Sequence, residues 1–252
     1  MMTTTRAFSA HLSQALRERV LSLSDTSRPE GPALLAAAAG TEIAKATGFG
    51  PLEKLCKPLI VPSALAVALR DGRLNPVDTA LLSVTGAAYT TGDVILMLGD
   101  GHAGRSTSRL VSGAAAFGVG HLALGGMMLR SGLRFKPAQA AVHGVVAGAV
   151  GAVLLSEDRA NAPLAAYAGL LATLSALATS VDRRSGPGAS VLAVAGPVFL
   201  LSDSLILLRR RAEEGSALAR ALDVGVIDTY ATAALLLLTG TAAAARTAGA
   251  TA

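Results

Sequence analysis

The sequence predicts an all-α protein, a polytopic bundle of transmembrane helices. Hydrophobic residues make up 52% of its 252 residues and charged residues 15%, whereas a soluble domain carries roughly 25% charged residues. Apolar stretches of about 17–22 residues recur from residue 32 onward, which is long enough for helices to cross a bilayer. We therefore expect a polar N-terminal segment at 1–30 and a single transmembrane domain at 31–252.

The N-terminal segment is compatible with two structures. Its apolar residues recur every three to four positions among arginines, at Phe8, Leu12, Leu16, Val20 and Leu23. This period is typical of an amphipathic helix lying on a membrane surface. An unstructured tail is the alternative. The segment contains no apolar core of the kind found in a cleavable signal peptide.

The rest of the chain divides into about eight predicted spans. Glycine, proline and charged residues occupy the connectors between them, and the spans cover residues 32–47, 55–69, 77–98, 110–129, 138–155, 163–180, 189–208 and 222–239. An even number of spans places both termini on one side. Lysine and arginine are somewhat more frequent on that side, which favours cytoplasmic termini in a cell-membrane protein.

The net charge of +5 does not indicate a nucleic-acid partner. The basic residues are spread over many loops, and aromatic residues make up only 3% of the chain, so stacking surfaces for bases are missing. Cys56 is the only cysteine, and the histidines and acids show no metal-ligand spacing. We expect no metal and no other cofactor.

Two stretches share one pattern, in which an aspartate lies inside an apolar span. Each has a glycine, an aromatic residue three positions later and an aspartate four positions after that; the residues are Gly86, Tyr89 and Asp93 in one stretch, and Gly196, Phe199 and Asp203 in the other. On a helix these positions share one face. The stretches lie four spans apart, which is compatible with a parallel repeat of two four-helix halves.

The direction of the spans predicts that several polar residues lie at one level of the membrane. With alternating spans, one half of the bilayer holds Asp93, Asp203, Lys57, His121, Tyr230 and Glu42. We interpret this as a single polar site, with Asp93, Asp203 and His121 as catalytic candidates and Lys57, Tyr230 and Glu42 as substrate-binding candidates. Each also has a structural interpretation: the acids can bond to neighbouring helices, His121 can simply pack, and Lys57 and Tyr230 can anchor at the interface.

Two carboxyl groups in hydrocarbon suit acid–base chemistry. A charged side chain at mid-membrane costs about 2.5–3.5 kcal/mol on insertion scales, so two of them need a reason to be there. When two carboxyls lie close together, one tends to keep its proton while the other ionises, as general acid–base catalysis requires. A proton-coupled transporter or a lipid-binding membrane protein would use the same acids. Gly196-Pro197 would favour a transporter if it broke its helix.

These motifs resemble the YhhN-like integral membrane proteins, which include the animal lysoplasmalogenases. The resemblance extends over about residues 34–238, and it is carried by Lys57-Pro58-Leu59, Gly92-Asp93, the glycine-rich approach to His121, the stretch from Gly196 to Ser202-Asp203, and Tyr230. It implies hydrolysis of the vinyl-ether bond of an alkenyl lysophospholipid, which yields an aldehyde and a glycerophospho-alcohol. Asp93 and Asp203 would share the acid–base roles, Lys57 would hold the phosphate, and His121 and Tyr230 would orient water or a carboxyl.

The chain departs from the family pattern at two positions. Leu124 lies where the family usually has an aromatic residue, and Ala234 lies where it often has Gln or His. An intramembrane aspartyl protease also uses two acids, but Thr90 occupies the first glycine position of its GxGD signature. The expected partners are a lysophospholipid substrate and membrane lipids, and a homo-oligomer is compatible with the sequence.

Overall fold

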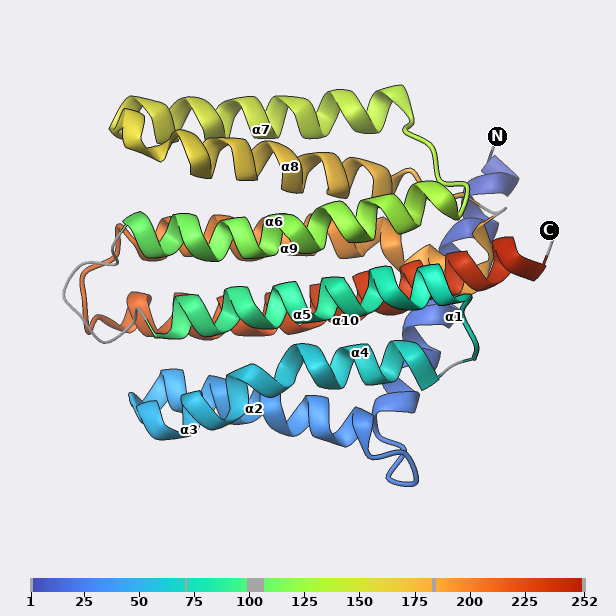
Figure 1. Ribbon diagram of the computed structural model, residues 1–252, viewed down its shortest axis with the longest axis horizontal. Coiled ribbons are helices and arrows are strands. Elements are labelled where there is room, and N and C mark those ends of the chain that lie inside the picture. The colour runs from blue at the N-terminus through green and yellow to red at the C-terminus, as the bar shows by residue number, and fades with distance from the viewer. Residues whose placement is uncertain (1, 71, 99–106, 183–184, 251–252) are drawn as a thin grey trace.

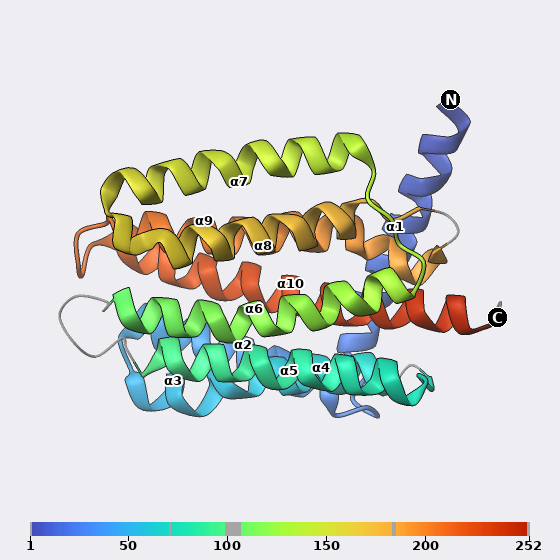
Figure 2. The ribbon, with the colours of Figure 1, turned by 45° about the horizontal axis from the view of Figure 1, so that its top comes forward.

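The protein is a bundle of long helices aligned along one axis (Figure 1). The computed structural model describes residues 2–70, 72–98, 107–182 and 185–250, and those residues form helices and connectors without any strand. Successive long helices run in opposite directions (Figures 1 and 2). The all-α prediction is confirmed.

The N-terminal segment is helical. Helix α1 (Met2–Leu23) lies across one end of the bundle, where Ala15 is buried and Leu16 and Leu23 pack against the core. Val20, which was expected on the apolar face, is 65% exposed, and the side chain of Phe8 lies outside the described part of the chain. Attachment of this helix to a membrane surface stays a prediction.

The next part of the chain folds into shorter helices. They are α2 (Glu30–Thr47), α3 (Gly50–Cys56), η1 (Lys57–Leu59) and α4 (Ile60–Arg70). Pro58 lies in η1, and a proline cannot donate the backbone hydrogen bond that an uninterrupted α-helix requires there. Lys57 is thereby placed at a junction between helices instead of inside one.

A tightly packed helix pair follows. Helix α5 (Pro76–Met97) is capped at its N-terminus by Asn75, whose side chain accepts a hydrogen bond from the Asp78 backbone amide, and it lies against α6 (Thr107–Arg130). A Cβ added at Gly92 would come within 2.6 Å of the Phe117 ring. The glycines therefore allow the two helix backbones to approach closely.

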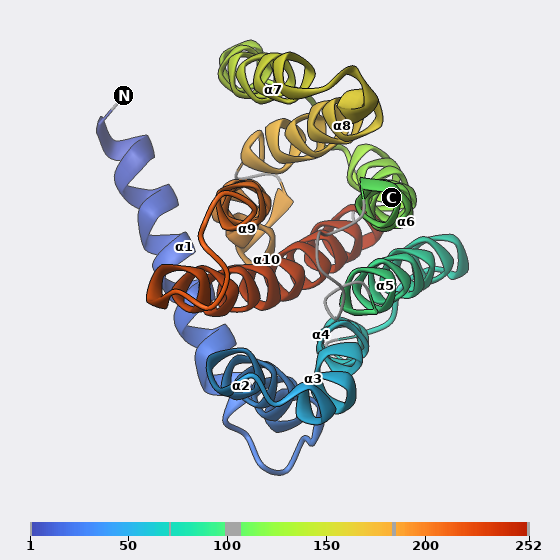
Figure 3. The same ribbon diagram turned by 90° about the vertical axis from the view of Figure 1, so that its left-hand side faces the viewer.

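Helices α7 (Pro137–Glu157) and α8 (Ala162–Thr179) form an outer hairpin joined by η2 (Arg159–Asn161). Seen from the end, α8 lies between α7 and the rest of the bundle (Figure 3). Helix α7 packs mainly on α8. Most of its apolar surface is therefore left for lipid.

The last two helices complete the core. The turn η4 (Pro187–Val191) leads into α9 (Leu192–Arg209), which continues through Pro197 without a break. Helix α10 (Ala217–Ala250) has 34 residues and contacts α2, α4, α6 and α9. It is the most buried of the long helices and forms the centre of the bundle (Figure 3).

In the described part of the chain, six helices are long and apolar enough to cross a membrane, rather than the eight predicted. They correspond to the predicted spans from 77–98 to 222–239. The two N-terminal predictions differ, because α2 carries Glu30, Glu42 and Lys45, and the segment 55–69 is divided at Pro58. The protein is thus a multi-pass membrane protein.

Candidate active site

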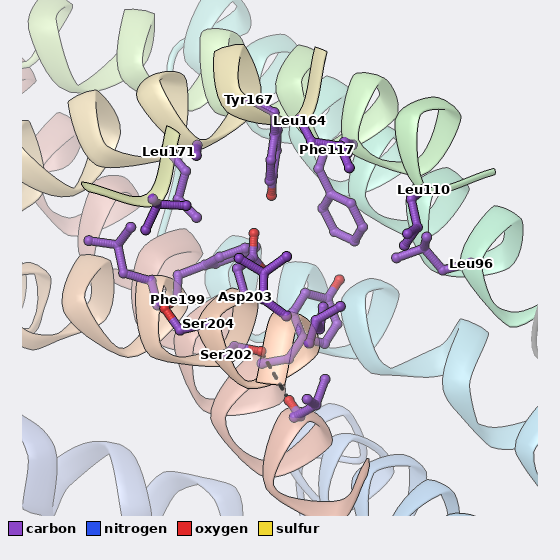
Figure 4. Close-up of a pocket in the computed structure, with 18 of the residues that line it drawn as sticks. Leu96, Leu110, Phe117, Leu164, Tyr167, Leu171, Phe199, Ser202, Asp203 and Ser204 are labelled. Atoms are coloured by element: carbon purple, nitrogen blue, oxygen red, sulfur yellow. Dashed lines mark hydrogen bonds between the residues drawn. The ribbon is translucent and has the colours of Figure 1, made fainter. Parts of the chain in front are cut away.

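A pocket lies between the helices, close to the end of the bundle where α5 and α9 terminate. It encloses about 1070 Å³ of empty space, part of which is open to the exterior. Most of its wall is apolar, and the polar residues that line it include Lys57, Asp93, Asp203, Tyr167 and Tyr230. Figure 4 shows several of the lining side chains pointing into it.

Asp93 is one of the two aspartates that line the pocket. The side chain projects from the buried face of α5 and is 3% exposed. The Tyr230 hydroxyl on α10 donates a 2.7 Å hydrogen bond to its Oδ2 atom. Lys57, at the start of η1, is also buried and lies near enough for its ammonium to attract the Asp93 carboxyl. Asp93 therefore has two partners that stabilise negative charge.

Asp203 enters the same pocket from α9. The hydroxyl of Tyr167 on α8 points toward its carboxyl (Figure 4). Next to it, the Ser202 hydroxyl donates a 3.1 Å hydrogen bond to the Val226 carbonyl and fixes α9 against α10. The two aspartates thus line one pocket, each with its own tyrosine.

His121 lies one layer behind the pocket wall. It is 1% exposed. Its Nδ1 atom is 2.7 Å from the Tyr89 hydroxyl, and its Nε2 atom is 3.3 Å from the Tyr167 hydroxyl. If Nδ1 accepts from Tyr89, the Nε2–H donates to Tyr167 and leaves the Tyr167 proton free to point at Asp203. The imidazole therefore acts on the pocket through Tyr167.

Aromatic rings surround this network. Phe199 packs against Tyr89, His121 and Tyr230 with ring centroids 5.1–5.7 Å apart, and Phe117 lies 5.8 Å from Tyr230. Edge-to-face contacts of this kind fix ring positions. The tyrosine hydroxyls are consequently held in place by packing as well as by hydrogen bonds.

Helices α7 and α8 form an apolar wall of the pocket. It offers only hydrocarbon surface over a stretch formed by Val146, Ala147, Val150, Leu154, Leu164, Ala168 and Leu171. Leu164 and Leu171 are seven residues apart, so this wall is about 10 Å long at 1.5 Å per helical residue. Such a surface suits an alkyl chain.

The structure brings four of the six candidates from the sequence to this pocket. Asp93, Asp203, Lys57 and Tyr230 line it. His121 contacts two tyrosines but is absent from the lining. Glu42 on α2 does not line it either, and it interacts electrostatically with Asp228 instead. Within the described residues, no three His, Cys, Asp or Glu side chains lie close enough together to hold a metal ion.

Tyr167 was missed by sequence reasoning. It lies in the first half of the span predicted at 163–180, which is the half that the predicted span directions assign to the other polar candidates. The chain has three tyrosines, and all three lie in this network. Their rarity in so apolar a sequence was the available signal.

Comparison with known proteins identifies a family that this chain matches. The model of the YhhN family matches residues 52–241, a range that contains all of the pocket-lining residues named above. No curated protein matches the chain, and no solved structure matches it.

Proposed function

Because the chain belongs to the YhhN family, we propose that it is a membrane-embedded, lysoplasmalogenase-like hydrolase that cleaves the vinyl-ether bond of alkenyl lysophospholipids. The observation that carries the proposal is a pair of aspartates, each faced by a tyrosine, that line a mostly apolar pocket. In an alkenyl lysophospholipid, the vinyl-ether bond joins the hydrocarbon chain to the glycerol. The apolar wall would hold the chain, and the aspartates would lie at the bond that reacts.

The two aspartates differ in their surroundings, and this difference suggests their roles. Lys57 and Tyr230 both stabilise negative charge on Asp93, so we assign Asp93 the carboxylate role. Asp203 faces Tyr167 and is assigned the acid role. The family resemblance implied Lys57 as the phosphate ligand. Because Lys57 is buried and its charge acts on Asp93, we assign it the Asp93 carboxylate as its partner instead.

The proposed reaction consists of a proton transfer, the addition of water and the cleavage of the carbon–oxygen bond. Asp203 donates a proton to the alkenyl carbon remote from the ether oxygen, and the adjacent carbon becomes an oxocarbenium ion that the Asp93 carboxylate stabilises. Water adds to this carbon while Asp93 takes one of its protons, which gives a hemiacetal. Asp93 returns that proton to the ether oxygen as the carbon–oxygen bond breaks, and the hemiacetal hydroxyl proton restores Asp203. The products are an aldehyde and a glycerophospho-alcohol.

His121 is proposed as a positioning residue instead of a catalytic one. It holds Tyr167 by a 3.3 Å contact and a stacked ring geometry, and Tyr167 in turn faces Asp203. Glu42 has no role in this proposal, since its side chain does not line the pocket.

The proposal is tested by product analysis with three lipids that share one chain length. Purified protein in detergent is incubated with an alkenyl, an acyl and an alkyl lysophospholipid. Aldehyde from the alkenyl lipid, with no product from the other two, is the expected result. Release of fatty acid from the acyl lipid would assign an esterase instead.

If none of the three lipids gives a product, the second candidate function, transport or lipid binding, would be favoured, because it would use the same buried aspartates. The sequence argument for transport relied on a helix break at Gly196-Pro197, and α9 is continuous there. Lipid binding without turnover is supported by the same apolar wall. Proton-dependent lipid uptake into vesicles would identify a transporter.

A further inference from the structure

Three consecutive arginines lie at the last residue of α9 and just beyond it, and two of them are paired. Arg209 Nε lies 2.9 Å from Asp223 Oδ2, and Arg211 forms an ion pair with Glu157 at the end of α7. Arg210 differs from both. Its guanidinium forms no hydrogen bond or ion pair with any described residue.

Arg210 lies at the junction of two cavities. It lines the main pocket, and it also lines a smaller cavity of about 410 Å³ between the ends of α7 and α9. The two share Leu154, Leu207 and Arg210, and the smaller one adds Val153, Glu157 and Arg211. The smaller cavity thus forms a charged mouth beside an apolar interior.

The distance from Arg210 to the reactive groups fits a lipid headgroup. Arg210, the C-terminal cap of α9, follows Asp203 by seven residues, or about 10 Å at 1.5 Å per residue. The arginine side chain is exposed and can extend back toward the pocket. This separation leaves room for a glycerol unit between the bond that reacts and an anion held at the mouth.

From these observations we propose that Arg210 binds the phosphate of a single-chain phospholipid whose hydrocarbon lies on the α7–α8 wall. A guanidinium donates parallel hydrogen bonds to two phosphate oxygens. The ion pair of Arg209 holds the end of α9 to α10, and that of Arg211 holds the turn after α9 to the end of α7, so the mouth is fixed in shape around the one arginine of the three that is left for a ligand. The identity of the lipid rests on the proposed function, whereas the phosphate contact does not.

The test measures binding without turnover. A fluorescent alkyl lysophospholipid, which has no vinyl ether to cleave, is titrated into purified protein in detergent, and an alkylglycerol of the same chain length is titrated in parallel. Arg210→Gln is expected to weaken phospholipid binding about tenfold, the scale of one lost charge-assisted contact, and to leave alkylglycerol binding unchanged. Arg210→Lys should restore part of the loss.

The matched control is Lys54→Gln, which removes an exposed charge from α3 at the same end of the bundle. It should leave both affinities unchanged. Equal weakening of both lipids by Arg210→Gln, or equal weakening of phospholipid binding by Lys54→Gln, would overturn the assignment. Displacement of the lipid by inorganic phosphate at matched concentration would also overturn it, in favour of a free-anion site.

Failure of this proposal and failure of the hydrolase proposal are distinguishable. If the protein binds the phospholipid through Arg210 but releases no aldehyde, the phosphate site is confirmed and the hydrolase proposal is wrong. If the wild-type protein releases aldehyde and the Arg210→Gln variant binds the phospholipid as tightly as the wild type does, the hydrolase proposal holds and the assignment of Arg210 to the phosphate is wrong.

Discussion

The Tyr230 hydroxyl donates a 2.7 Å hydrogen bond to Asp93 across 137 residues of chain. This bond joins the central helix α10 to α5 at the lining of the pocket. The same carboxyl is also attracted by Lys57 from η1. Three parts of the chain thus converge on one membrane-embedded acid.

Tyr230→Phe should lower kcat about tenfold, because it removes a charge-assisted hydrogen bond from the proposed carboxylate. Most of the ring contacts with Phe117 and Phe199 remain, so the thermal midpoint should change little. Initial rates of aldehyde release and thermal unfolding are measured together. An unchanged kcat would show that this bond does not serve turnover.

His121→Leu should lower kcat while leaving KM nearly unchanged, because His121 acts on the pocket through Tyr167. Combining it with Tyr167→Phe should cost much less than the two single losses added together, since both changes break one network. His121→Gln, whose amide both donates and accepts, should recover part of the rate. Additive losses in the double variant would contradict a positioning role.

Gly120→Ala should destabilise the protein by about 1–3 kcal/mol. An added Cβ would overlap the Tyr89 ring and lie 3.3 Å from the Thr85 carbonyl, which would also displace the partner of His121. The matched control is Gly126→Ala on the same helix, where a Cβ meets nothing within 4 Å. That variant should be neutral or slightly stabilising. The thermal midpoints of the two variants are compared in detergent.

Ala147→Phe should reduce turnover of long-chain substrates more than that of short-chain ones. Ala147 lines the apolar wall on α7, and a phenyl ring there would occupy the space assigned to the alkyl chain. Ala149→Phe places the same ring on the exposed face of α7 and should have no effect. Equal rates for all chain lengths in Ala147→Phe would place the chain elsewhere.

Much of this architecture follows from local sequence. Apolar length and turn residues predicted the helices from residue 76 onward, and the alternation of helix directions predicted that Asp93, Asp203, Lys57 and Tyr230 share one end of the bundle. These features follow from the spacing of apolar residues and from whether a span is odd-numbered or even-numbered in the chain. Prediction failed at 55–69, where the apolar stretch folds as separate short helices around Pro58.

Contacts between distant helices could not be predicted in the same way. Glu42 is at the same level along its predicted span as the other candidates, but it lies on α2 and does not line the pocket. Tyr167 lines the pocket although no motif surrounds it in the sequence. His121 has the right depth as well and is one layer too far back. Depth follows from position in a span, but the direction a side chain faces depends on how each helix is rotated against its neighbours.

The central claim is that two membrane-embedded aspartates divide the acid and carboxylate roles. The most direct measurement is aldehyde release from an alkenyl lysophospholipid by Asp93→Asn and Asp203→Asn, with Asp228→Asn on the exposed face of α10 as control. Each pocket variant should lose at least about 100-fold in kcat and remain folded, and the control should keep full activity. Full aldehyde release by either Asp93→Asn or Asp203→Asn would contradict the mechanism.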